Sequence, residues 1–187
     1  MLAHTLISYL SEADYLAMEM TSQERHEYVD GAIFAMTGAS RAHNQIGGNL
    51  YSFFHAQVKN TPCRVYMSDV KLKIAHKKTY YYPDVMLACS QAETDDYAIT
   101  EPCLIIEVLS PATALIDKRE KLIAYQNVSS VQEYCLVAQD KYCVEKYTRH
   151  QNPQGWFLDH YGKADRVPFV CVDCGISVRD IYSGVLA

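Results

Sequence analysis

The amino-acid sequence predicts an α+β fold, in which a mixed β-sheet is flanked by helices and preceded by an N-terminal β-hairpin. Apolar residues alternate on both sides of Asp30-Gly31, a helical pattern runs from residue 40 to 59, and strand-like runs fill much of 63–109. The chain has 187 residues, of which 49% are hydrophobic and 21% charged. This length and composition suit a single domain that spans residues 1–187.

The first expected elements are a short helix and a hairpin. Residues 11–20 are typical of a helix that begins at Ser11, because a serine hydroxyl can accept hydrogen bonds from the free amides of a first turn. Residues 26–36 alternate around Asp30-Gly31, a dipeptide that supplies the positive φ angles of a tight turn. We therefore expect two antiparallel strands there.

A longer helix is expected from Ser40 to about Lys59, because residues of one face recur at spacings of three and four. This stripe contains Ile46, Gly47, Leu50, Phe53, Phe54 and Gln57. His43 falls on the same inward side near the start of the helix.

Four strand-like runs follow, all rich in Val, Ile, Tyr and Leu. They cover residues 63–67, 70–75, 79–88 and 103–109. The polar and acidic segment 90–100 is interpreted as a surface connection.

A second helix is predicted over 117–126. Asp117 is followed three residues later by Glu120, which is a capping-box pattern, and Leu122 and Tyr125 share one face. Three further strands and a short terminal segment complete the expected fold, at residues 133–137, 142–147, 155–160 and 177–182.

Charge and cysteine content narrow the functional classes. The formal net charge is −5, which disfavours a polybasic coat, so any nucleic-acid site must be local.

The seven cysteines are an odd set, mostly in apolar runs, which is typical of reduced thiols in a cytosolic protein. Cys171 and Cys174 form one C-x-x-C pair without a second pair, so no zinc site is predicted. No window approaches the roughly 18 apolar residues of a membrane helix, and we expect a cytoplasmic protein.

Two carboxylates stand inside otherwise apolar runs. Asp84 lies in 80–88 and Glu107 in 103–111, and burying an ionised carboxylate costs several kcal/mol unless it meets a cation or hydrogen-bond donors. On neighbouring strands the two would form a site for Mg²⁺, which prefers oxygen ligands. Alternatively, Glu107 pairs with a Lys or Arg and Asp84 belongs to a turn after Pro83.

Phosphate-binding loops such as GxxxxGK[ST] and GxGxxG are absent from the sequence, so a nucleotide cofactor is not expected.

The order of these motifs resembles a known superfamily. A Pro83-Asp84 pair, then Glu107 in an apolar strand, then a lysine-bearing helix is similar to the PD-(D/E)XK nucleases. More closely, the chain resembles a bacterial family of restriction-endonuclease-like proteins long known as a domain of unknown function. The motifs that carry this resemblance over about residues 8–183 are Glu27-Tyr-Val-Asp-Gly31, His43-Asn44, Ser68-Asp69, Tyr82-Pro-Asp84, Glu107-Val-Leu-Ser-Pro111, Asp117 to Lys121 with Tyr125, and Glu133-Tyr134.

The sequence departs from the superfamily at one position. The superfamily's lysine stands two residues after the glutamate, on the same face of the strand, and here that position is Leu109. The resembling family carries its lysine on the following helix, where Lys118 and Lys121 are candidates. Lys121 is four residues from both Asp117 and Tyr125, so we choose Lys121. Both lysines could instead be solvated helix charges.

The resemblance implies a restriction-endonuclease-like sheet and Mg²⁺-dependent hydrolysis of DNA, with Mn²⁺ able to substitute. Asp84, Glu107 and the backbone carbonyl of Val108 would hold the cation. Lys121 would orient water or offset charge at the phosphate, with Lys118 as a possible supporting residue.

Two more residues enter through the same resemblance. Glu27 would be a further acidic member of the site, and His43 could contact a phosphate or a metal-bound water. Glu27 could also be a charge on the hairpin surface, and His43 a hydrogen-bonded core histidine. Asp69 is interpreted as structural.

Partners follow from the proposed chemistry. Lys71 and Lys73, beside Tyr80 to Tyr82, could track a DNA backbone, although a solvated hairpin tip is an alternative. A homodimer is expected because cutting both strands commonly uses two sites. Two rival functions remain: a catalytically impaired nuclease fold that binds nucleic acid or protein, and an assembly protein with a tyrosine-rich interface, suggested by the 15 tyrosines.

Overall fold

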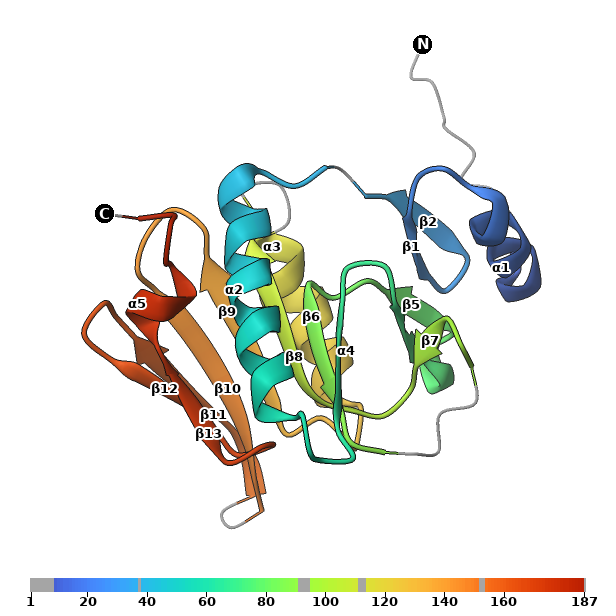
Figure 1. Cartoon of the computed structure of the whole chain (residues 1–187). Coiled ribbons are helices and arrows are strands. Elements are labelled where there is room, and N and C mark those ends of the chain that lie inside the picture. Colours follow the sequence, from blue (N-terminus) through green and yellow to red (C-terminus); the bar gives the residue numbers. More distant parts are fainter. Residues whose placement is uncertain (1–8, 37, 91–94, 111–113, 152–153, 187) are drawn as a thin grey trace.

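The computed structural model describes residues 9–36, 38–90, 95–110, 114–151 and 154–186, and it has the predicted α+β architecture (Figure 1). The strands form a six-stranded sheet, a five-stranded sheet and a two-stranded ribbon. Among the described residues, no helix has the length and apolar character needed to cross a membrane.

The six-stranded sheet has the order β11-β10-β9-β8-β6-β3. It is mixed, because β8 pairs antiparallel with β6 and parallel with β9. The central strands β8 and β9 are mostly buried, as their apolar sequences predict. The strands are β3 (Arg64–Met67), β6 (Val85–Ala88), β8 (Pro102–Leu109), β9 (Glu133–Ala138), β10 (Val144–Gln151) and β11 (Gln154–Tyr161).

The five-stranded sheet has the order β2-β1-β5-β4-β7 and contains the predicted hairpin. Asp30 and Gly31 connect the hairpin strands with φ angles of 43° and 96°, as the sequence pattern requires. Its strands are β1 (His26–Val29), β2 (Ala32–Ala35), β4 (Lys71–Ile74), β5 (Thr79–Tyr81) and β7 (Ala98–Ile99). A 3₁₀ turn, η1 (Ala75–Lys77), links β4 to β5. The predicted surface connection over 90–100 is therefore wrong for 98–99, which are buried in β7.

The expected single strand over 79–88 is two strands in two different sheets. Tyr82, Pro83 and Asp84 lie between β5 and β6, and proline has no amide hydrogen to continue a ladder. The chain therefore leaves the five-stranded sheet after Tyr81 and enters the six-stranded sheet at Val85. Asp84 stands at this crossing point.

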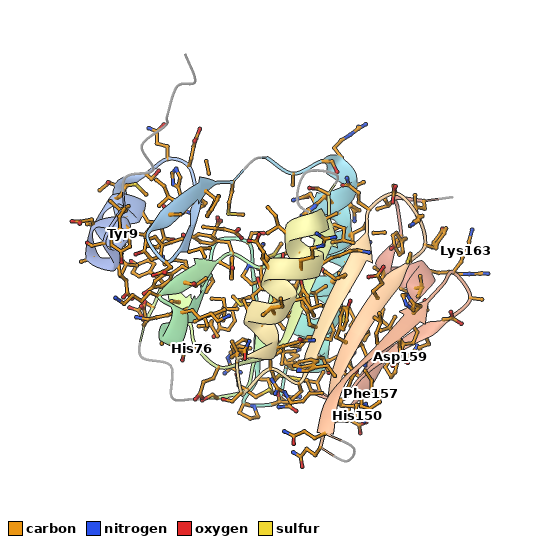
Figure 2. The ribbon with its side chains drawn as sticks, turned by 180° about the vertical axis from the view of Figure 1, so that it is seen from behind. Tyr9, His76, His150, Phe157, Asp159 and Lys163 are labelled. Atoms are coloured by element: carbon orange, nitrogen blue, oxygen red, sulfur yellow. A yellow bond between two sulfur atoms is a disulfide. The ribbon has the colours of Figure 1, made fainter. Side chains whose placement is uncertain are left out.

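Helices cover the six-stranded sheet on both faces (Figures 1 and 2). On one face, α2 (Arg41–Gln57) packs through Ile46, Leu50 and Phe54, beside the β12–β13 ribbon. On the other, α4 (Leu122–Gln126) packs against the sheet through Ala124 and Tyr125, and the five-stranded sheet contributes to the same core. Gln57, expected on the inward stripe of α2, is exposed.

The remaining elements are mostly short. Ser11, Ser40 and Ser177 accept hydrogen bonds at the beginning of α1 (Glu12–Thr21), of α2 and of α5 (Val178–Ile181). The ribbon of β12 (Arg166–Phe169) and β13 (Cys174–Ser177) was not predicted, because its strands are four residues long and contain Pro168 and Gly175.

The second predicted helix begins earlier than expected. Helical residues run through α3 (Ala114–Ile116), the π-helical segment η2 (Asp117–Lys121) and α4. The capping box is therefore wrong, because Asp117 lies inside the helical segment and is buried.

The expectation of seven reduced cysteines is also wrong. Disulfides join Cys63 to Cys89 and Cys103 to Cys171. The members of each pair are far apart in the sequence, so no local pattern could reveal them. Three cysteines are free: Cys135, Cys143 and Cys174.

The tyrosines form cores and not a broad surface. Tyr15, Tyr28 and Tyr80 make an aromatic cluster that joins α1 to the hairpin. Among the large hydrophobic side chains that the described residues expose, the tyrosines are Tyr9 and Tyr97. Figure 2 shows Tyr9 and the exposed Phe157 at opposite ends of the molecule. The tyrosine-rich interface is therefore not present among the described residues.

Candidate active site

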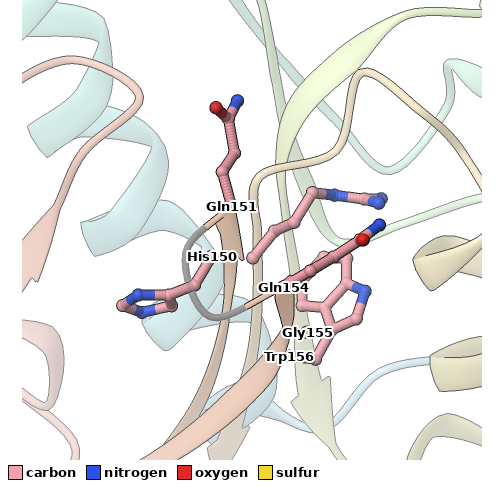
Figure 3. A pocket seen from close by; sticks show the side chains of 6 residues that line it. His150, Gln151, Gln154, Gly155 and Trp156 are labelled. Carbon is pink, nitrogen blue, oxygen red and sulfur yellow. The ribbon is translucent and has the colours of Figure 1, made fainter.

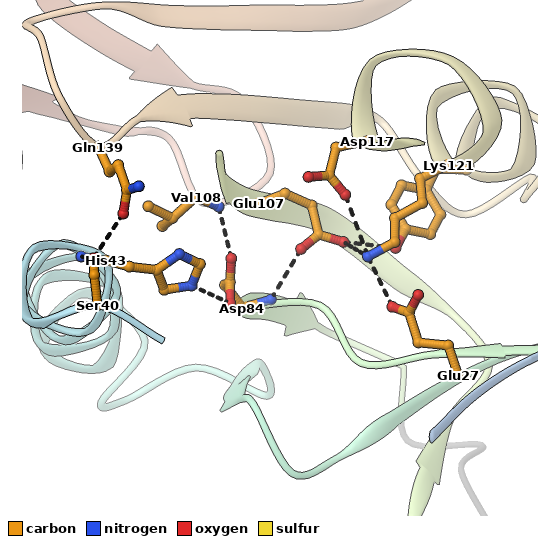
Figure 4. A network of polar contacts seen from close by, with 10 residues as sticks. Glu27, Ser40, His43, Asp84, Glu107, Val108, Asp117, Lys121 and Gln139 are labelled. Atoms are coloured by element: carbon orange, nitrogen blue, oxygen red, sulfur yellow. Dashed lines mark hydrogen bonds and ion pairs between the residues drawn. The ribbon is translucent and has the colours of Figure 1, made fainter. Parts of the chain in front are cut away.

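Asp84 and Glu107 meet across neighbouring strands. Val85 pairs with Ile106, so the antiparallel register places Asp84 opposite Glu107 one position farther along. The backbone amide of Asp84 donates to Oε2 of Glu107 at 3.4 Å (Figure 4). The two predicted carboxylates therefore belong to one site at the edge where β6 begins.

Asp84 is held by two donors. Its Oδ1 lies 2.8 Å from Nε2 of His43, which α2 presents near its first turn, and its Oδ2 accepts from the backbone amide of Val108 at 2.7 Å. Burial lowers the pKa of His43, but the hydrogen bond to Asp84 and the charges of Asp84 and Asp117 outweigh burial and raise it. A protonated His43 would be an ion-pair partner that orients Asp84.

Glu107 is 4% exposed and makes two further side-chain contacts. Its Oε1 accepts from the Lys121 ammonium at 3.2 Å and from the Tyr125 hydroxyl at 2.8 Å. Lys121 and Tyr125 are four residues apart and face the same side, as their spacing predicts. The long hydrogen bond from the Asp84 amide leaves Oε2 the less engaged of the two oxygens.

The ammonium group of Lys121 is buried and is surrounded by three carboxylates. Its Nζ lies 2.8 Å from Oε1 of Glu27 and 3.3 Å from Oδ1 of Asp117, in addition to Glu107. The π-helical segment η2 presents both Asp117 and Lys121 to the interior, and π-helical turns are frequent at functional sites. The lysine that the strand lacks is therefore supplied to the same site by the helix.

The site carries more negative than positive charge. Burial raises the pKa of Glu107, the Lys121 ammonium opposes this, and Asp84, Asp117 and Glu27 raise it further. Burial lowers the pKa of Lys121, but the surrounding carboxylates dominate and hold it well above its ordinary value. Lys121 is therefore a permanent cation beside a carboxyl group that retains its proton more strongly than usual.

The donor set fits a hard divalent cation. Asp84 and Glu107 offer carboxylate oxygens from adjacent strands, and a cation would offset the excess negative charge. Nδ1 of His43 is buried without a hydrogen-bond partner, and the polar contact of the buried Oδ1 of Asp117 is its ion pair with Lys121. Val108 contacts Asp84 through its amide, so its carbonyl as a metal ligand stays a prediction.

The predicted cationic residues outside this cluster lie elsewhere. Lys118 pairs with Glu145 at 2.6 Å and lines a pocket together with Ser110 and Gln139, which does not include Asp84, Glu107 or Lys121. A second pocket, at the tip of the β10–β11 hairpin, is lined by Arg149, His150, Gln151, Gln154, Gly155 and Trp156 and contains none of the predicted site residues (Figure 3).

The structure contradicts the expectation that Lys71 is exposed to track a DNA backbone. Lys71 is 7% exposed and its ammonium lies over the rings of Tyr82 and Tyr97, because β4 turns it into the interior. Lys73 is partly exposed but pairs with Glu12 at 3.3 Å. Asp69, interpreted as structural, is exposed and lies 3.6 Å from Arg25.

Sequence reasoning missed the roles of Asp117 and Tyr125 at this site. Their spacing to Lys121 had placed all three on one helix face, which is the signal that identifies them. The Ser40–Gln139 hydrogen bond of 2.7 Å, which ties α2 to the end of β9 beside His43, had no sequence signal (Figure 4).

Comparisons with known proteins agree with this architecture. Two proteins of Synechocystis sp., named "Uncharacterized protein slr1290" and "Uncharacterized protein sll1609", are 34% and 33% identical to the chain. The alignments cover 94% and 86% of this chain and 93% and 92% of those proteins. A crystal structure of "a putative nuclease belonging to DUF820" from Anabaena variabilis has the same fold, with a TM-score of 0.77 and 18% identity over 95% of this chain and 99% of that one. The model of the Uma2 family, described as "Putative restriction endonuclease", matches residues 12–168, and the chain belongs to this family.

Proposed function

We propose that this protein is a Mg²⁺-dependent endonuclease that hydrolyses phosphodiester bonds of DNA. One observation carries the proposal: Asp84 and Glu107 face each other across neighbouring strands, and the Lys121 ammonium lies 3.2 Å from Glu107. In this chain the helical segment η2 supplies, through Lys121, the charge that Leu109 cannot supply in the strand. The descriptions of the family and of the Anabaena protein support the same reaction class.

Each residue then has a defined task. Asp84 and Glu107 would hold the cation, which when bound supplies Lewis-acid chemistry that activates water and offsets phosphate charge; Mn²⁺ should substitute for Mg²⁺. His43 orients Asp84. Lys121 keeps positive charge next to Glu107, which favours the ionised carboxylate, and Glu27 and Asp117 hold Lys121 in place.

Asp84→Asn tests the proposal with little change in shape, because the amide oxygen can still accept from Val108. Wild-type protein is incubated with plasmid and oligonucleotide DNA in Mg²⁺, Mn²⁺ or EDTA, and nicked, linear and shortened products are quantified. We expect cleavage with either metal, none in EDTA, and a loss of at least about 100-fold in Asp84→Asn. Asp69→Asn, an exposed carboxylate elsewhere, is the matched control and should cleave like wild type. Equal cleavage by wild type and Asp84→Asn contradicts the assignment.

The rival function is DNA or protein binding without cleavage. It is favoured by the burial of Lys121, whose side chain is 7% exposed, because a buried ammonium offers a phosphate little access. Electrophoretic mobility shifts of the same DNA separate the two functions. Binding by the wild type without products under both metals supports the rival and overturns the endonuclease proposal.

A homodimer is part of the proposal, because cutting both strands of a duplex calls for two sites. Light scattering coupled to size exclusion measures the mass directly. A monomeric protein that nicks only one strand would be consistent with the proposed hydrolysis and would contradict the proposed homodimer.

A further inference from the structure

Four cysteines converge at one end of the six-stranded sheet. This end lies away from the acidic cluster of Glu27, Asp84, Glu107 and Asp117. Cys63 directly precedes β3, Cys89 directly follows β6, and Cys103 is the second residue of β8. These three strands are antiparallel neighbours in the order β8-β6-β3, so their cysteines meet at the same end of the sheet. Cys171 reaches the same point from the turn between β12 and β13.

Three of the four sulfur atoms are close enough to share one ion. Sγ of Cys89 lies 3.8 Å from Sγ of Cys103, and the Sγ atoms of Cys89, Cys103 and Cys171 all lie within 4.8 Å of one another. Cys63 is bonded to Cys89 and so belongs to the same group. Zinc–sulfur bonds of about 2.3 Å place sulfurs around a tetrahedral ion about 3.8 Å apart.

We propose that Cys63, Cys89, Cys103 and Cys171 form a four-cysteine centre that binds Zn²⁺ when reduced and forms the two disulfides when oxidised. Thiolate sulfur is a soft ligand that selects zinc over magnesium. Four protein ligands leave no open position, so the ion is structural.

The two states are related by balanced steps. Two molecules of a dithiol reductant each deliver two electrons and two protons, which breaks both disulfides and gives four thiols and two oxidised reductants. Binding of one Zn²⁺ then releases the four thiol protons and leaves four thiolates on the ion. Cys89, Cys103 and Cys171 are half-buried, so reductant and metal can reach them.

The centre would fasten the C-terminal ribbon to the sheet. Cys171 is the ligand supplied by the ribbon, while the other three come from sheet strands. Cys103 precedes Glu107 by four residues and Cys89 follows Asp84 by five, which along extended strands corresponds to about 13 Å or more. The zinc centre is therefore separate from the acidic cluster and independent of the proposed nuclease function.

Cobalt titration of the full-length protein tests the centre. The protein is reduced and kept anaerobic, and Co²⁺ alone is added while absorption is recorded. We expect thiolate-to-cobalt charge-transfer bands and tetrahedral visible bands that saturate at one ion per chain and disappear when Zn²⁺ displaces Co²⁺. Absence of charge-transfer bands in the reduced wild-type protein overturns the proposal without any variant.

Variants then assign the ligands. Cys103→Ser should lose the four-sulfur spectrum, whereas Cys174→Ser, a half-buried free cysteine three residues from Cys171, should keep it. Asp84→Asn should also keep it, which separates this site from the proposed Mg²⁺ site. Native mass spectrometry of the wild type should show one zinc and a loss of four protons on reduction and metal addition. A spectrum that Cys174→Ser abolishes and Cys103→Ser retains contradicts the ligand set.

Discussion

At the scale of single residues, Lys121 is the cation that offsets the negative charge of the acidic cluster. It is 5% exposed and pairs with Glu27, Glu107 and Asp117, so its removal would leave three carboxylates without a cation. Lys121→Ala is therefore a poor activity test by itself, because loss of folding and loss of chemistry would coincide. Asp84, which is more exposed than Glu107 and lies outside these ion pairs, is the better position for that purpose.

We expect Lys121→Met to lower the free energy of unfolding by roughly 3–5 kcal/mol near pH 8, because it breaks buried ion pairs while preserving side-chain volume. The loss should shrink as pH falls. The Lys121 ammonium lowers the raised pKa of Glu107, so without it the folded variant binds this proton more strongly than the folded wild type does. Acidification therefore stabilises the variant more than the wild type, and the difference between them falls. Urea denaturation at several pH values measures the effect.

Lys118→Met is the matched control for this prediction, since Lys118 lies on the same helical segment but pairs with Glu145 in a partly exposed position. It should change stability by less than about 1 kcal/mol. A Lys121→Met protein as stable as Lys118→Met at pH 8 would contradict the charge-balance role.

Metal binding should itself appear as a pH-dependent stabilisation. Protons and the cation compete for Glu107, whose pKa burial raises, so Mg²⁺ should raise the melting temperature more at pH 8 than at pH 5.5. Differential scanning fluorimetry with Mg²⁺ or EDTA measures the shift. Asp84→Asn should show a smaller shift at pH 8, and an unchanged shift in that variant would exclude Asp84 as a ligand.

At the scale of elements, the N-terminal hairpin positions Glu27. The turn requires a φ angle of 96° at Gly31, a region that L side chains rarely adopt, and a Cβ there would lie 2.2 Å from the ring of Tyr9. The hairpin brings Glu27 of β1 to within 2.8 Å of Lys121, so its turn also supports the acidic cluster.

Gly31→Ala should destabilise the protein by about 1–2 kcal/mol, from left-handed backbone strain together with displacement of Tyr9. Gly38→Ala is the control, since its added Cβ would meet nothing within 4 Å. Thermal unfolding of both variants gives the comparison. Equal melting temperatures would mean that the turn can relax into another type.

At the scale of the whole molecule, one buried ion pair joins the central sheet to the ribbon. Glu133 of β9 and Lys146 of β10 lie 2.8 Å apart, and Oε2 of Glu133 accepts from the backbone amides of Val170 and Cys171 at 3.0 Å. Both charged side chains are almost fully buried. The motif residue Glu133 therefore has a structural task, which is to hold the turn that carries Cys171.

We expect Glu133→Gln to cost about 3–5 kcal/mol, because a buried Lys146 would lose its counter-charge. Hydrogen exchange should then show faster exchange in the β12–β13 ribbon than in β6 and β8. Glu24→Gln, an exposed site, is the control. Uniform loss of protection throughout the molecule would show that the ribbon and the sheet unfold as one unit.

Local sequence signals predicted most elements but not their sheets. The serine cap of α1, the Asp30-Gly31 turn and the apolar strand around Glu107 depend on nearest neighbours, and the structure confirms them. The division of 79–88 at Pro83 was missed because nothing local indicates to which sheet a strand pairs. The position of Lys71 was wrong for a related reason: a lysine in a strand can be turned under aromatic rings, and no local signal shows this.

The sequence by itself determined the α+β class, the carboxylate pair of Asp84 and Glu107 and the choice of Lys121, because these follow from local periodicity and ordered motifs. Only the tertiary structure decided that Glu27, Asp117 and His43 join the same cluster, and that four scattered cysteines share one sheet edge. The physical reason is that pairing between distant strands and the packing of helices on them set these distances. Both depend on burial in the complete core, which no local window of sequence contains.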